Sequence, residues 1–343
     1  MPVKVFNIFS KLQIIIISSV FIAIVLIGYF IFFTPNHFEK KAPFRFEIKD
    51  GESFTSVTER LYSDSIIPSK FNFKIAAFIY GAEKNIKAAR FKIPNDLSYL
   101  DLLDLFVNGP ADYLKPIKIN DGQTLKWLGA KVKRDLKIDS AAFVNLATEK
   151  EFIKSLGLDV STLEGYLFSK KYKVYENASP EEALKIFYKA FTEFFNDSLK
   201  QRANKIGLSV HQVLTLASII KGETNLVSEM PTISAVYHNR LKIGMRLQAD
   251  PTIQYLLPNG WRRLTYDDLK IDSKYNTYKY SGLPPGPINN PGANAIMAVL
   301  YPDKNNYLYF VANGNGGHKF AKSYSDHLKN VAQYRKWLKE QSQ

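Results

Sequence analysis

One glutamate stands where the chain itself favours acid–base chemistry. Glu223 follows the apolar segment 210–221 and Gly222, so we expect it beside the C-terminus of a buried helix. The negative end of the helix dipole and an apolar surrounding both disfavour a charged carboxylate there. Both effects raise the pKa of the carboxyl toward neutrality, where a general acid works best. Position alone leaves an alternative, an ordinary exposed glutamate in a helix-ending turn.

Other chemistries have less support. The chain has no cysteine, which excludes disulfides, thiolate nucleophiles and Cys-based zinc sites. Its five histidines show no His-Glu-x-x-His spacing, and neither a Gly-x-Ser-x-Gly elbow nor a glycine-rich phosphate loop is present. We therefore expect no metal and no cofactor. Carboxylate chemistry is what remains, and it points toward cleavage of glycosidic bonds.

The segments around Glu223 have mainly helical patterns from about residue 145. Residues 179–182 (SPEE) predict a capping box with proline at the first helical position, and we expect that helix to end at Gly207. Ser209 and Gln212 open the next helix. Its apolar residues cover most of its circumference, so we expect it to be buried.

Downstream of Glu223 the chain alternates helices with loops. A helix is expected from Pro231 to Gly244 and another over 293–300. Residues 307–311 predict a strand and 313–317 a turn. We expect His318 to be a turn residue, with a place in the lining of a cleft as the functional alternative.

A weak internal repeat precedes this helical region. Residues 46–54 (FEIKDGESF), 91–99 (FKIPNDLSY) and 117–125 (IKINDGQTL) each predict a short strand, a turn and a capping Ser or Thr. The repeat favours small strand-plus-helix units over 44–140, of the kind found in glycan-binding LysM modules. Generic strand–turn–helix connectors are the alternative. The expected fold class is therefore α+β.

The longest apolar run covers residues 12–33. These 22 residues carry no charge, and as a helix they span about 33 Å, enough to cross a membrane. A cleaved signal peptide would have a shorter apolar region and a small-residue cleavage site. The run ends instead in aromatic residues, which favours an uncleaved single-pass anchor.

The charges flanking this run bear on its orientation. Lys4 and Lys11 favour a cytoplasmic segment 1–11, whereas Lys40 and Lys41 weaken the argument. The formal net charge of +14 favours polyanionic partners such as nucleic acid, anionic lipid or acidic glycans, and a solvated basic surface without such a partner is the alternative. Because we expect the domain to lie outside the cytoplasm, we expect no nucleic-acid partner.

Several segments together resemble the MltG (YceG-like) family of endolytic murein transglycosylases. In chain order these segments are 216–224 (LASIIKGET), 237–252 (YHNRLKIGMRLQADPT), 275–278 (YNTY), 281–288 (SGLPPGPI), 290–292 (NPG), 307–312 (YLYFVA) and 316–320 (GGHKF). The resemblance is dense over 214–330 and looser over 44–210. It implies a YceG-like catalytic domain over 145–343.

The resemblance also implies residue roles. The glutamate before the threonine is the catalytic one in the family, which corresponds to Glu223. The family commonly has a further glutamate two positions earlier, where this chain has Lys221. Residues 163–168 (LEGYLF) match, but the usual Pro-Asp-Thr after them is Ser-Lys-Lys, so Glu164 is the candidate supporting acid. Candidates for lining the substrate cleft are Asn239, Arg240, Gln248, Asp250, Tyr275, Asn276, Tyr278 and His318.

The implied activity is cleavage of the β-1,4 bond between N-acetylmuramic acid and N-acetylglucosamine, leaving 1,6-anhydro ends and terminating strand elongation. Peptidoglycan glycan strands and the bacterial cell membrane are the expected partners, with cell-wall synthases as candidate protein partners. A water-using murein hydrolase with a second carboxylate (Glu164 or Asp250) stays open. So do a non-catalytic, membrane-tethered glycan binder and a basic membrane-surface scaffold.

Overall fold

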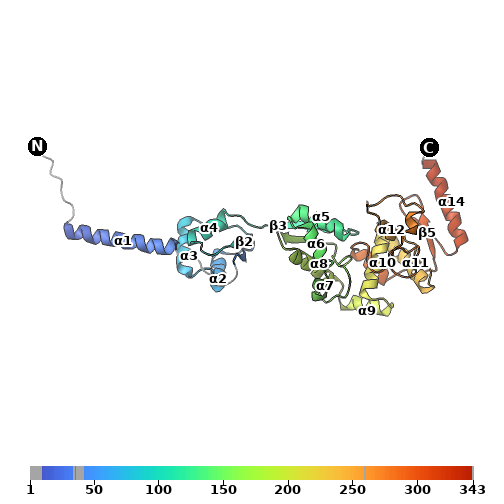
Figure 1. Cartoon of the computed structure of the whole chain (residues 1–343), viewed down its shortest axis with the longest axis horizontal. Coiled ribbons are helices and arrows are strands. Elements are labelled where there is room, and N and C mark those ends of the chain that lie inside the picture. The colour runs from blue at the N-terminus through green and yellow to red at the C-terminus, as the bar shows by residue number, and fades with distance from the viewer. Residues whose placement is uncertain (1–9, 34, 36–41, 259, 342–343) are drawn as a thin grey trace. The chain divides into compact units, whose positions relative to one another are not determined.

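The computed structural model describes residues 10–33, 35, 42–258 and 260–341. The chain divides into two compact units, residues 1–114 (unit 1) and 115–343 (unit 2), each described here by itself (Figure 1). The sequence analysis had separated 44–140 from 145–343, so the third strand–turn–helix repeat falls in unit 2. Helices dominate both units, and the strands form three two-stranded sheets within the described residues.

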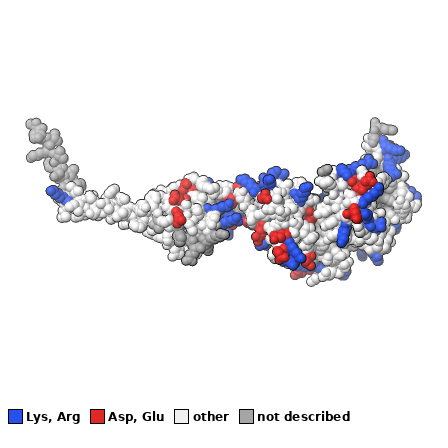
Figure 2. Space-filling view, in the orientation of Figure 1, with Lys and Arg blue, Asp and Glu red and all other residues white. Residues whose placement is uncertain are grey.

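Helix α1 (Lys11–Phe33) is the apolar run. Its segment Lys11–Phe30 has a mean hydropathy of 2.5 and is long and apolar enough to cross a membrane. Figure 2 shows it as a rod without charged side chains beyond Lys11. The helix is therefore a candidate membrane anchor. Lys4, Lys40 and Lys41, which bear on its orientation, lie outside the described residues.

Unit 1 folds around two antiparallel strands and the helices next to them. The elements are β1 (Phe44–Glu47), α2 (Phe54–Ser63), α3 (Lys70–Tyr80), β2 (Arg90–Ile93) and α4 (Tyr99–Val107). In the β1–β2 pair, Phe46 lies opposite Phe91, and both side chains are buried with Phe106. Buried aromatic and aliphatic side chains from all five elements form one continuous core.

The repeat predicts the strand–turn–helix pattern correctly in all three places. Ser53, Ser98 and Thr124 each cap a helix by accepting a hydrogen bond from the backbone N–H three residues later. These caps satisfy backbone donors that a helix N-terminus would otherwise leave free. The local chemistry of the repeat is thus confirmed, whereas its LysM-like character stays a prediction.

Unit 2 is mostly helical. Its strands are β3 (Leu114–Lys118), which pairs with β4 (Lys171–Tyr175), and β5 (Tyr309–Ala312), which pairs antiparallel with β6 (His318–Ala321). Its α-helices are α5 (Leu125–Leu136), α6 (Ser140–Leu146), α7 (Lys150–Ser155), α8 (Pro180–Phe194), α9 (Asp197–Lys205), α10 (Val210–Glu223), α11 (Met230–Lys242), α12 (Asp250–Gln254), α13 (Ala293–Leu300) and α14 (Tyr324–Gln341). Two short 3-10 turns complete it, η1 (Val227–Glu229) and η2 (Asp268–Lys270).

Helix α10 lies in the centre of the unit 2 core, as its apolar circumference predicts. Every residue from Val213 to Ile220 is buried. Ser209 and Gln212 form the expected capping box. The loop before α13 is fastened to the same helix, because Ser218 Oγ accepts from the backbone N–H of Ile288 (3.0 Å) and its carbonyl accepts from the Asn289 amide (2.8 Å).

Several boundaries differ from those expected from the sequence. The helix expected from Pro231 to Gly244 is Met230–Lys242, and the strand expected over 307–311 is Tyr309–Ala312. The helix opened by Ser179 ends at Phe194 rather than at Gly207, because Asn196 caps a separate helix, α9, by accepting from Leu199 N–H. Helix α10 includes Gly222 and ends at Glu223, two residues beyond the expected end. Glu223 is therefore the last helical residue and is not part of a turn.

Candidate active site

Glu223 is held by a buried tyrosine of the neighbouring helix. The Tyr237 hydroxyl, on α11, donates a hydrogen bond of 2.5 Å to Glu223 Oε1. Tyr237 is fully buried, and its ring packs edge-on against Phe310 of β5. Tyr237 is not among the residues predicted for the site from sequence, because its helical spacing is equally typical of a core residue.

The surroundings of Glu223 favour the protonated carboxyl. Burial raises its pKa to about 7, and the nearby negative charge of Asp250 acts in the same direction. The Tyr237 hydrogen bond and the positive charge of Arg240 oppose that rise. A carboxyl with a pKa near 7 can both give and take a proton at neutral pH.

Asp250 lies near Glu223 because helices α10 and α12 are in close contact. It is the first residue of α12 and is followed by Pro251. A Cβ on Gly222 would lie only 2.5 Å from Pro251 Cβ, so the absence of a side chain there lets α12 approach the end of α10. The Asp250 side chain is exposed and accepts a hydrogen bond from the Tyr278 hydroxyl. Asp250 and Tyr278 therefore belong to the surroundings of Glu223.

Arg240 and Asn239 chiefly hold the backbone of unit 2. Arg240 is 6% exposed and donates to the carbonyls of Leu308 (2.7 Å) and Leu247 (2.5 Å). The Asn239 amide donates to the carbonyls of Asn305 and Tyr307, both at 3.0 Å. Arg240 adds positive charge near Glu223, but its hydrogen-bonding groups face the protein backbone.

Three further cleft candidates have structural contacts. Asn276 is fully buried, and its amide donates to the carbonyls of Leu269 (2.9 Å) and Ile271 (2.7 Å). The Tyr275 ring packs against Tyr255, at a centroid distance of 5.2 Å. The exposed Gln248 has a φ of 47° and donates its backbone N–H to Thr277. These contacts shape the loops, and their contact with substrate stays a prediction.

A cavity of about 410 Å³ adjoins Glu223. Three segments line it: the end of α10 with the residues after it, the glycine-rich turn between β5 and β6, and helix α14. The lining residues are Gly222, Glu223, Thr224, Asn225, Leu226, Ala312, Gly314, Gly316, Gly317, His318, Tyr334 and Trp337. His318, the first residue of β6 and not a turn residue, lines the same cavity as Glu223, and its contact with substrate stays a prediction.

His318 is fixed by a residue that the sequence analysis missed. Glu229 Oε2 lies 2.8 Å from His318 Nδ1, and Glu229 Oε1 accepts the His318 backbone N–H at 2.9 Å. A Cβ on Gly317 would lie 2.5 Å from Glu229 Oε1, so a larger residue there would displace the Glu229 carboxylate from this pair. Nothing in the sequence connects residues 229 and 318, which the fold alone brings together.

Glu164 lies in a different set of contacts. It is 3% exposed and accepts from the Leu125 N–H at the start of α5 (2.9 Å) and from the Asn290 amide (3.0 Å). Asn290 in turn accepts from the backbone N–H groups of Gly165 and Leu167. Burial raises the pKa of Glu164 to about 8, against the effect of the Leu125 hydrogen bond. These bonds join three chain segments, so the role of Glu164 in this structure is to stabilise the fold.

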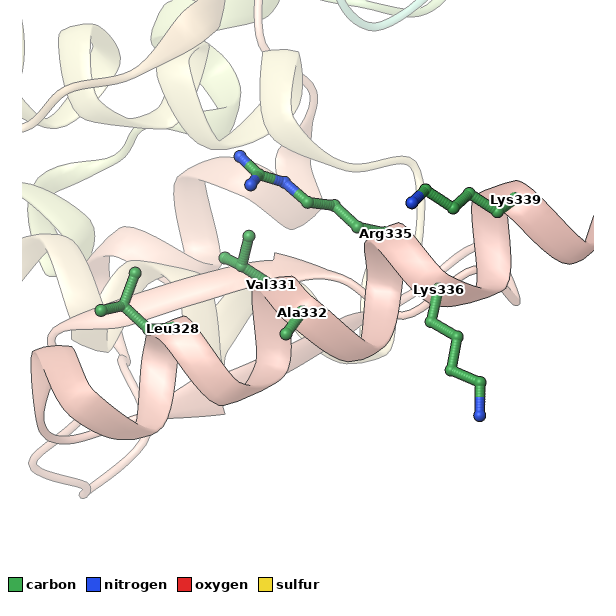
Figure 3. Close-up of a pocket in the computed structure, with 6 residues that line it drawn as sticks. All are labelled: Leu328, Val331, Ala332, Arg335, Lys336 and Lys339. Carbon is green, nitrogen blue, oxygen red and sulfur yellow. The ribbon is translucent and has the colours of Figure 1, made fainter.

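A second hollow, of about 400 Å³, follows the surface of α14 (Figure 3). Its lining is Leu328, Val331, Ala332, Arg335, Lys336 and Lys339. This set contains no carboxyl or imidazole group. Of these two hollows, the one beside Glu223 has a carboxyl group in its lining.

A half-buried carboxyl whose pKa is raised to about 7, at the edge of a cavity, is suited to acid–base chemistry. The comparisons with known proteins concern the chain as a whole. The chain belongs to the YceG-like family, whose model matches residues 46–333.

Its relatives include proteins named endolytic murein transglycosylase. One from Bacillus subtilis is 32% identical over 88% of this chain and 87% of its own length. One from Streptococcus pneumoniae strain D39 is 27% identical over 84% of this chain, which spans 57% of that longer protein. A crystal structure of a putative YceG-like protein from Listeria monocytogenes is 30% identical, with a TM-score of 0.59 over 83% of this chain and 98% of that one.

Proposed function

We propose that this protein is an endolytic murein transglycosylase, a lytic enzyme that cleaves peptidoglycan glycan strands with Glu223 as its acid–base residue. The observation that carries the proposal is the Glu223 carboxyl. Its pKa is raised to about 7, it accepts a hydrogen bond from Tyr237 at Oε1, and it lines a cavity. Membership of the YceG-like family and the names of the relatives support it.

The first step uses Glu223 as an acid. The protonated carboxyl donates its proton to the oxygen of the β-1,4 bond between N-acetylmuramic acid and N-acetylglucosamine. The bond between that oxygen and muramyl C1 breaks, and N-acetylglucosamine leaves with a new hydroxyl group. Glu223 is left as a carboxylate, which Tyr237 and Arg240 stabilise.

The second step uses the same residue as a base. The Glu223 carboxylate takes the proton of the muramyl C6 hydroxyl, whose oxygen then bonds to C1. The product ends in a 1,6-anhydro ring, no water is consumed, and the carboxyl regains its proton. One group serves both steps because the acid of the first becomes the base of the second.

Hydrolysis is the second candidate, favoured by the position of Asp250. Its charge acts on Glu223, and its side chain is exposed. Glycosidases pair two carboxylates, one of which activates water or attacks C1. The two routes differ in the products, since an anhydro end is one water lighter than a reducing end.

The test is digestion of purified, un-crosslinked glycan strands by the full chain in detergent, followed by mass analysis. Anhydro ends support the lytic reaction, and reducing ends support hydrolysis. No release of fragments would contradict both and leave a glycan-binding protein.

The remaining expectations concern the other parts of the chain. We propose that α1 anchors the protein in the bacterial cell membrane, with residues 1–11 in the cytoplasm and the catalytic region outside. We also propose that unit 1 is a LysM-like glycan-binding module, supported by the β1–α2–α3–β2 order around one core. Cell-wall synthases are candidate partners because they make the same strands.

A further inference from the structure

Two aromatic side chains of α14 share the cavity with Glu223. The rings of Tyr334 and Trp337 are stacked, with centroids 5.9 Å apart and an angle of 13° between their planes. Both side chains are partly exposed, and both line the cavity. They lie beyond residue 333, where the match to the family model ends, so this wall of the cavity is a feature of the chain outside that match.

Trp337 is fixed by the glycine-rich turn. Gly314 has a φ of 88°, a conformation that other residues rarely adopt, and a Cβ there would lie 2.5 Å from the Trp337 ring. The indole therefore packs directly on the backbone of the turn that also carries His318. Contact with the turn and with the Tyr334 ring holds the indole in place at the cavity.

A rigid aromatic surface suits a sugar ring. A pyranose has a face made of C–H groups, which is apolar enough to pack on an aromatic ring, while its hydroxyl and acetamido groups point to the sides. Ligand cavities commonly combine such aromatic walls with a few polar groups. Here the polar lining residues include Glu223, Thr224, Asn225 and His318, beside the glycines of the turn.

We propose that Tyr334 and Trp337 form a glycan subsite that stacks on a sugar next to the bond that is cleaved. The inference rests on the proposed function and adds to it a residue pair that sets substrate affinity. A glycan strand continues on both sides of its scissile bond, so residues that share a cavity with the catalytic acid face a neighbouring sugar. The occupant is an N-acetylhexosamine unit of the strand.

The kinetic test compares Trp337→Ala with Trp261→Ala in the full chain in detergent. The substrate is un-crosslinked glycan strands stripped of their peptide stems. Trp261 is 72% exposed and does not line the cavity, so it is a matched control. Loss of one stacking contact should raise the KM of Trp337→Ala about five- to ten-fold and leave kcat nearly unchanged. Trp337→Phe, which keeps a ring over Gly314, should recover most of that loss.

A binding test separates this inference from the proposed function. The chain has three tryptophans, and Trp127→Phe with Trp261→Phe leaves Trp337 as the sole one. In that background, with Glu223→Gln to stop turnover, we expect stem-free strands to change the Trp337 fluorescence in a saturable way.

Three outcomes decide the matter. An unchanged KM for a folded Trp337→Ala, together with an unresponsive fluorescence, would overturn the subsite. An effect confined to strands that carry peptide stems would also overturn it, since the occupant would then be the peptide. If the wild type releases no fragments, the proposed function fails, while the fluorescence titration still tests sugar binding. Equal thermal unfolding midpoints for wild type and Trp337→Phe show that α14 remains packed.

Discussion

Glu164 is buried and Glu223 is half-buried, and these two glutamates of unit 2 have different hydrogen-bond partners. Glu164 accepts bonds from a backbone N–H and from the Asn290 amide, and these donors join separate segments of the chain. Glu223 accepts one bond, from a tyrosine hydroxyl, and otherwise faces a cavity. A carboxyl enclosed by protein donors stabilises the fold, whereas a carboxyl at a cavity can exchange protons with a substrate.

This difference predicts that Glu→Gln substitution has a small effect on kcat at position 164 and a large effect at position 223. Glu164→Gln keeps an acceptor for Leu125 and should retain most of the kcat. Glu164→Ala leaves the Leu125 N–H and the Asn290 amide without that acceptor and should lower the free energy of unfolding by about 2–4 kcal/mol. Denaturant unfolding and strand digestion measure the two effects. A kcat that collapses in a fully folded Glu164→Gln would instead make Glu164 a catalytic acid.

Tyr237 tunes the pH range in which Glu223 can act as an acid. The acid form is lost as the pH rises through the pKa near 7, so the rate of the first step should fall above neutrality. Tyr237→Phe removes a bond that lowers this pKa, and the alkaline limb of the kcat profile should therefore move to higher pH.

Tyr166→Phe is the matched control for that profile. Tyr166 is also buried in unit 2, and its hydroxyl bonds to His211 instead of a carboxyl. The alkaline limb of the kcat profile of Tyr166→Phe should coincide with that of the wild type. An alkaline limb that stays in place in Tyr237→Phe would show that another group titrates.

At the scale of elements, the closeness of α10 and α12 depends on Gly222. Alanine inside a helix is normally favoured over glycine by about 1 kcal/mol. At Gly222, however, the new Cβ would lie 2.5 Å from Pro251 Cβ. We expect Gly222→Ala to destabilise the protein by about 1–2 kcal/mol because α12 must move. The kcat should fall as well, since Asp250 begins that helix.

Thermal unfolding of Gly222→Ala beside Asn204→Ala checks this prediction. Asn204 is exposed on α9, so alanine there should keep or slightly raise the stability. Equal stability of both variants would mean that the α10–α12 contact is looser than the structure shows.

Helices and strands could be predicted from the sequence wherever they are marked by residues close to one another in the chain. Ser53, Thr124 and Ser209 mark helix starts because each caps a backbone N–H three residues away. The helix break at Phe194 was missed because Asn196 reads as a cap only once the preceding helix is known to stop. Glu223 was found through its position after a buried helix and through the family resemblance. Its partner Tyr237 and the Glu229–His318 pair depend on tertiary packing, which spacing does not reveal.

At the scale of the whole molecule, the apolar helix α1 accounts for membrane attachment in our proposal. A chain of residues 42–343 lacks α1, so it should leave the membrane fraction while digesting soluble strands at an unchanged kcat. Fractionation after a high-salt wash measures this, because salt screens contacts between the basic surface and anionic lipid. Retention of the shortened chain on washed membranes would show that another part of the molecule binds them.

The division into units was less accessible from sequence than the strands and helices themselves. The three repeats have the same local pattern, yet β1 and β2 pair with each other whereas β3 pairs with β4, far along the chain. Strand pairing over such separations is set by the packing of each core. Local alternation of apolar residues cannot specify it.

The central claim is that Glu223 gives and then takes the proton in a lytic cleavage. The most direct measurement is the mass of the fragments released from un-crosslinked glycan strands by the wild type and by Glu223→Gln. The account predicts 1,6-anhydro ends from the wild type and a loss of at least about a thousand-fold in rate for the variant, whose amide cannot exchange the proton. Cleavage by Glu223→Gln at a rate near that of the wild type would contradict it.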